Sequence, residues 1–84
     1  MNKLLIYILL TVSAYSNCES GHWIDNVMSN GEIIKLEDGS LWKVNSSDTY
    51  NSAIWIAIDN IVICDDNKLI NTDDNTAVSV NQIK

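Results

Sequence analysis

Two short, largely apolar segments bounded by polar residues mark the middle of the chain. Residues 32–36 and 40–44 are each predicted to form a β-strand, in which every second side chain lies on the same face. Between them lies Glu37-Asp38-Gly39, and Asp-Gly supplies the backbone conformations that a hairpin turn requires. The same period puts Trp42 and Val44 on one face, which we expect to be buried. The pattern therefore predicts a β-hairpin.

Three more short strands follow the hairpin. They are predicted at residues 61–64, 68–71 and 76–82, and the turns between them, at 65–67 and 72–75, are rich in Asp and Asn. Short strands at such regular spacing are typical of barrels. The fold class expected is therefore an all-β, five-stranded, closed or nearly closed barrel.

For two apolar segments the sequence leaves the secondary structure open. Residues 22–28 have apolar positions that fit a helix or a strand, and we expect an initial strand or a short lead-in packed on the barrel. Residues 53–58 alternate Ile with Ala and Trp, which fits a strand or an apolar loop closing one end of the barrel. The polar stretch 45–52 is too hydrophilic for a strand, and Ser47-Asp48 could cap one helical turn there.

The start of the chain has a different pattern. Lys3 precedes an apolar run over residues 4–12, and Ser13-Ala14-Tyr15-Ser16 follows, which is the layout of a secretory signal peptide. We expect cleavage after Ser16, with Ala14 as the alternative. A retained membrane anchor is not expected, because a spanning helix needs about 20 apolar residues. The predicted organisation is a signal peptide at 1–16, an N-terminal lead-in at 17–30 and the barrel at 31–84.

Two cysteines bear on the compartment. Export to an oxidising compartment, periplasmic or secreted, would allow Cys18 and Cys64 to form a disulfide. The alternatives are free thiols, or acylation of Cys18 as in a bacterial lipoprotein. The residues before Cys18 argue against acylation, because only Ser16 fits the lipoprotein pattern.

Charge excludes one class of partner. The formal net charge is −6, and it becomes −7 when Lys3 leaves with the signal peptide. The chain has no Arg, and its lysines are scattered, so a polyanion is repelled and nucleic acid is not an expected partner. The expected partner is another envelope or secreted protein.

Several segments together carry a family resemblance. They are the hairpin at 34–44, residues 48–49 and 52–55, Asp59, and residues 61–63, 69–71 and 78–80. They resemble a family of small uncharacterised bacterial proteins that pairs a DGS-x-W-x-V hairpin with a later S-x-x-W segment and a LIN strand. The resemblance spans residues 31–80 and implies an SH3-like or OB-like barrel, with no activity to transfer. Family members usually carry a Pro-Gly-Asp-like turn after the second Trp, where this chain has Ala57-Ile58-Asp59-Asn60.

The candidate binding residues are aromatic and apolar. Trp42 and Trp55 could form an aromatic platform for a peptide or a sugar, with Ile56 beside them. Core packing is the alternative, and we favour it for Trp42, since an inward-facing Trp fills a small barrel well. Trp55 fits either role, and a run as apolar as 53–58 would be an interaction patch if exposed.

Neither catalysis nor metal binding is expected. The Asp/Asn turns at 65–67 and 73–75 offer oxygen ligands, but successive turns of a meander lie at opposite ends of its strands. His22 is the only histidine and lacks the spacing of a triad or a metal site, and a Cys18–His22 nucleophile would need a preorganised pocket. We therefore expect no enzyme, cofactor or metal site. The function predicted is a protein-interaction or structural module, and the alternative is an acidic binder of cations or small ligands.

Overall fold

The strands form in the apolar-rich segments that lie between turns of polar residues. The computed structural model describes residues 17–84, so the predicted signal peptide lies outside the described residues. The strands are β1 (Cys18–Met28), β2 (Ile33–Leu36), β3 (Leu41–Val44), β4 (Asn60–Cys64), β5 (Lys68–Asn71) and β6 (Thr76–Gln82). The short helical elements are η1 (Ser29–Gly31), η2 (Ser46–Asp48) and α2 (Thr49–Ser52).

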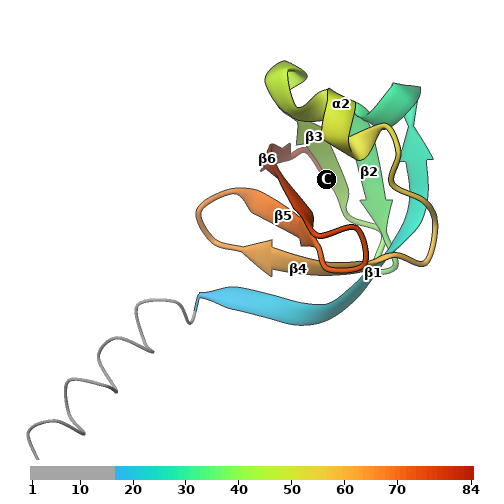
Figure 1. The fold of residues 1–84 in the computed structure, drawn as a ribbon. Helices are drawn as coiled ribbons and strands as arrows, with labels where there is room; N and C mark the ends of the chain where they lie inside the picture. Colours follow the sequence, from blue (N-terminus) through green and yellow to red (C-terminus); the bar gives the residue numbers. More distant parts are fainter. Residues whose placement is uncertain (1–16) are drawn as a thin grey trace, which may run out of the picture.

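Two antiparallel meanders close into one barrel (Figure 1). The first is β1–β2–β3 and the second is β4–β5–β6, and the pairing of β1 with β4 and of β3 with β6 joins them. The predicted all-β barrel is therefore confirmed. Closure gives every strand two neighbours, which removes the free edges on which unrelated chains can pair.

The number of strands predicted, five, is wrong, because the barrel has six. The additional strand is β1, which pairs with β4 through its first half and with β2 through its second half. Its register shifts twice, between Glu19 and His22 and between Ile24 and Asn26. Gly21, with φ +89°, lies within the first irregularity. These shifts break the two-residue period, which is why the sequence pattern there is ambiguous.

The buried face of the hairpin follows the predicted period. Ile34 and Leu36 of β2, and Trp42 and Val44 of β3, all point into the core. The whole hydrophobic core comprises Ile24, Ile34, Leu36, Trp42, Val44, Trp55, Ile61, Leu69, Val78 and Val80. Each of the six strands contributes to this core, so burial of apolar surface stabilises the closed barrel as one unit.

The connection from β3 to β4 is helical and then irregular. A helical turn that Ser47-Asp48 could cap was expected here, and the structure has the 3-10 turn η2 followed by α2, but the Asp48 side chain does not cap α2. Instead, Asp48 Oδ2 accepts a hydrogen bond from the N–H of Ser79 on β6, at 2.9 Å. The ambiguous segment 53–58 is a loop and not a strand.

Candidate functional site

An exposed apolar loop connects α2 to β4. We call residues 53–59 the isoleucine loop, because Ile54, Ile56 and Ile58 are between 65% and 76% exposed. Trp55, between the first two, is only 3% exposed. The loop therefore shows three large aliphatic side chains to solvent and sends its aromatic ring into the core.

The start of the loop is fixed against η1. Ser52, which is fully buried, donates its hydroxyl hydrogen bond to the carbonyl oxygen of Gly31 at 2.6 Å. Gly31 has φ +94°, and a Cβ placed there would lie 2.5 Å from the backbone nitrogen of Ala53. Only glycine allows the two backbones to come this close, so the position of the loop depends on Gly31.

Trp55 anchors the middle of the loop. Its indole N–H donates to Thr76 Oγ1 on β6 at 2.9 Å, and its backbone N–H donates to the carbonyl oxygen of Ser52 at 3.1 Å. A buried indole with a satisfied N–H fixes the backbone on both sides of it. The alternation that suggested a strand is thus produced by one inward tryptophan between outward isoleucines.

The end of the loop is tied to two strands. Ile58 N–H donates to the carbonyl oxygen of Ile24 on β1 at 2.8 Å, and Ile24 N–H donates to the carbonyl oxygen of Asp59 at 3.0 Å. Asp59 Oδ2 accepts hydrogen bonds from Ile56 N–H at 3.1 Å and from the Asn71 side chain on β5 at 2.9 Å. The three isoleucines therefore project from a backbone that is held at both ends and in the middle.

Ile58 has an unfavourable backbone conformation. Its φ is +78°, a region that costs little for Gly or Asn but is strained for a β-branched residue. It is also the most exposed of the large hydrophobic residues in the described part of the chain, so burial does not compensate for the strain.

Of the three predicted binding residues, the structure exposes one. Trp42 is 7% exposed, and its indole N–H donates to Ser40 Oγ at 2.8 Å, inside the core. Trp55 is buried as described above, so the two indoles do not form a surface platform. Ile56 is exposed on the isoleucine loop. Ile54 and Ile58 were missing from the predicted set, because their spacing could not show which side of the loop faces inward.

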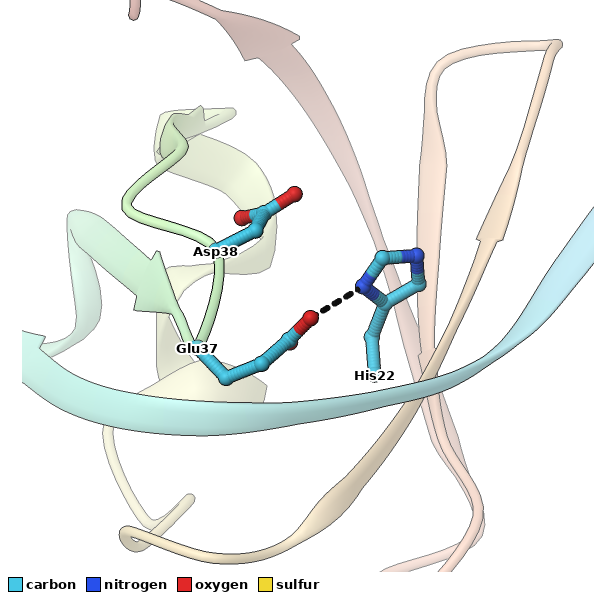
Figure 2. A group of neighbouring side chains, drawn as sticks. All are labelled: His22, Glu37 and Asp38. Carbon is cyan, nitrogen blue, oxygen red and sulfur yellow. Dashed lines mark hydrogen bonds and ion pairs between the residues drawn. The ribbon is translucent and has the colours of Figure 1, made fainter.

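A second group of side chains lies near the β2–β3 turn (Figure 2). His22 Nδ1 and Glu37 Oε2 are 2.9 Å apart. On the other side of the ring, Glu19 Oε1 lies 3.5 Å from His22 Nε2. Burial of the ring lowers the pKa of His22, but the hydrogen bonds and charges of Glu37 and Glu19 outweigh this effect and raise the pKa above its ordinary value. The hydroxyl and backbone N–H of Ser40 lower the pKa of Asp38.

The turn at 72–75 uses its polar groups in its own structure. Asp73 Oδ2 accepts from the backbone N–H of Asn60 at 2.8 Å. Asn71 Oδ1 accepts from the N–H groups of Asp73 and Asp74, each at 2.9 Å. This turn and the turn at 65–67 lie at opposite ends of β5, so their oxygens do not converge on one ion.

Cys18 and Cys64 form the predicted disulfide. The two residues are directly opposite each other in the β1–β4 pairing, so the bond joins the first strand of one meander to the first strand of the other. The helical elements in residues 17–84 have at most four residues, and none of them could span a bilayer.

The strand pairing and the Cys18–Cys64 bond define this protein as a small all-β barrel with one disulfide. Comparisons with protein-family models, with curated proteins and with solved structures found no match to the chain. The resemblance to the hairpin family therefore stays a prediction, and the function has to be argued from the residues themselves.

Proposed function

We propose that this barrel is an exported protein-binding module without enzymatic activity, and that it holds its partner with the isoleucine loop. The observation that carries the proposal is Ile58, which is both strained and exposed. Backbone strain of about 1–3 kcal/mol concentrates at functional positions, where a side chain is needed in spite of its cost. An exposed isoleucine contributes nothing to the core that would explain this conformation.

The anchored loop suits binding. A partner that docks on it does not have to order the backbone, because hydrogen bonds to β1, β5, β6 and η1 already fix the loop. The loss of conformational freedom in a mobile loop opposes association, and this loop has little left to lose. Burying the three isoleucines gains about 1.5–3 kcal/mol each, so they can supply the central contact of an interface of moderate affinity.

The negative charge of the barrel indicates which residues should surround the binding groove of its partner. Without Lys3 the net charge is −7, and two of the lysines, Lys35 and Lys43, face Asp25 and Glu32 at 3.6 and 3.7 Å. The partner we propose is an envelope or secreted protein with an apolar groove flanked by basic residues. Such a rim gives electrostatic complementarity and steers the encounter.

The disulfide supports export. Disulfides persist in oxidising compartments such as the periplasm and the exterior of the cell. The bond also bears on the lipoprotein alternative, because a Cys18 sulfur joined to Cys64 cannot carry a thioether-linked lipid. We therefore propose a periplasmic or secreted protein that is not acylated at Cys18.

Site-specific photo-crosslinking in the native host tests the proposal. A photo-reactive amino acid replaces Ile56, and the matched control places it at Ile83, an exposed isoleucine on the C-terminal segment. We expect a discrete adduct with one protein from position 56 and none from position 83. Adding Ile58→Asn should abolish the adduct, and with the purified partner it should weaken binding about 10–100-fold, which corresponds to the loss of one buried isoleucine.

Three outcomes would overturn this proposal. One is an adduct that survives Ile58→Asn, and another is the same adduct from position 83. The third is an adduct with twice the mass of the mature chain, which would make the occupant of the loop a second copy of this protein.

A further inference from the structure

We propose that His22, Glu37 and Asp38 form a binding site for a divalent first-row transition-metal ion, of which Zn²⁺ is the natural probe. His22 comes from β1, and the two carboxylates come from the β2–β3 turn. One potential ligand atom from each residue lies within 4.8 Å of the others (Figure 2). An imidazole nitrogen with two carboxylate oxygens is a three-ligand set that suits zinc and leaves a fourth position open.

Hydrogen bonds already hold the two carboxylates in place. Glu37 Oε1 accepts from the backbone N–H of Trp23 at 3.1 Å, which leaves Oε2 directed at His22. Asp38 Oδ1 accepts from the N–H and the hydroxyl of Ser40, at 3.0 and 2.6 Å, which leaves Oδ2 for an ion. Ligands held in this way do not have to be ordered when the ion binds.

Glu19 lies where the second partner of a metal-bound histidine would lie. It faces His22 Nε2, the ring nitrogen on the opposite side from Glu37, at 3.5 Å. Metal-bound histidines nearly always have their second nitrogen oriented by a carboxylate, a carbonyl or a water. The structure therefore contains both the ligand set and the carboxylate that would fix the ring.

The geometry needs little change to accept the ion. Neighbouring ligand atoms in a tetrahedral zinc site lie about 3.3–3.5 Å apart, given bonds of about 2.0–2.1 Å. That separation falls between the 2.9 Å hydrogen bond of His22 with Glu37 and the 4.8 Å limit of the cluster. The imidazole also favours zinc, nickel or copper over calcium and magnesium, which prefer oxygen ligands.

Zinc titration of the oxidised, chelator-treated protein tests the site. The protein is expressed from the complete sequence, and binding of ZnCl₂ is followed by calorimetry and by the imidazole resonances of His22, which need no assignment because the chain has one histidine. We expect one zinc per chain and a shift of these resonances that saturates at the same stoichiometry. CaCl₂ at the same concentration should leave them unchanged.

Charge-matched variants separate this site from unspecific attraction to an acidic protein. Asp38→Asn keeps an oxygen to accept the Ser40 hydrogen bonds and should lower the zinc affinity at least about 10-fold, and Glu19→Gln should lower it about 10-fold through the orientation of the ring. Asp66→Asn, in the β4–β5 turn, removes the same charge elsewhere and should have no effect.

Zinc that fails to shift the His22 resonances would overturn the proposal. So would equal zinc affinities of Asp38→Asn and Asp66→Asn. Should Asp38→Asn fail to fold, Glu37→Gln gives the same comparison, and circular dichroism of each variant shows which of them is folded.

Discussion

Single residues in left-handed conformations show where this chain follows its local preferences and where it does not. Asn67 and Asn75, in the turns on either side of β5, have positive φ and are of a type that tolerates it. Ile58 has a similar φ without that tolerance. The two asparagines fit this conformation, whereas Ile58 adopts it while its backbone N–H is hydrogen-bonded to the carbonyl oxygen of Ile24.

Replacing Ile58 by Asn should stabilise the protein. The substitution relieves the strain of a β-branched residue at φ +78° and is expected to raise the free energy of unfolding by about 1 kcal/mol. Ile56→Asn is the control, because Ile56 is similarly exposed but does not have positive φ, and its effect should stay within about 0.5 kcal/mol. Urea denaturation measures both. Destabilisation by Ile58→Asn would show that the conformation of Ile58 is not strained.

Replacing Ser40 by Ala should destabilise the core around Trp42. The buried Ser40 hydroxyl accepts from the Trp42 indole and donates to Asp38, so its loss leaves a buried indole N–H without a partner. Leaving this buried donor without a hydrogen bond should lower the free energy of unfolding by about 1–3 kcal/mol. The exposed Ser47→Ala is the control and should change stability by less than about 0.5 kcal/mol. Equal effects of the two substitutions in urea denaturation would show that the hydroxyl has no such role.

The sequence predicted single residues well where strand periodicity governs them and poorly where tertiary contacts do. The inward faces of Trp42 and Val44 follow from the hairpin. The approach of His22 to Glu37 does not follow from it, because the two residues are 15 positions apart and come together only when β1 pairs with β2. No local pattern marks such a contact.

At the scale of elements, regular strands were predictable and irregular ones were not. β2 to β6 coincide with short, apolar-rich segments between turn residues, and all five were predicted. β1 was ambiguous because two register shifts change which residues face inward. The isoleucine loop alternates without being a strand, because Ser52, Trp55 and Asp59 bond its backbone to other elements. Periodicity alone does not separate these cases.

The disulfide should contribute a large part of the free energy of unfolding of the barrel. It closes a separation of 46 residues, for which the chain-entropy model gives about 4 kcal/mol. The double variant Cys18→Ser, Cys64→Ser is expected to lose that amount in urea denaturation. Amide hydrogen exchange should increase first in the β1–β4 ladder, which the bond joins directly. An unchanged midpoint of unfolding would show that the barrel does not depend on the bond.

At the scale of the whole molecule, closure and the disulfide compensate for small size. The described part of the chain is about 68 residues long, and a domain of this size buries only about 60% of its unfolded surface. The closed barrel leaves no strand edge unpaired, and the disulfide limits the unfolded state. With this framework fixed, one loop can remain apolar and exposed.

The function proposed for this barrel depends most on its maturing and working outside the cytoplasm with its disulfide formed. An intact mass of the protein recovered from envelope and secreted fractions of its native host, with and without thiol alkylation, tests that claim directly. The predicted result is a chain beginning at Asn17, two hydrogens lighter than the reduced mass and unreactive to alkylation. A chain that retains residues 1–16 with two alkylated thiols, or one that begins at Cys18 with added acyl groups, would contradict it.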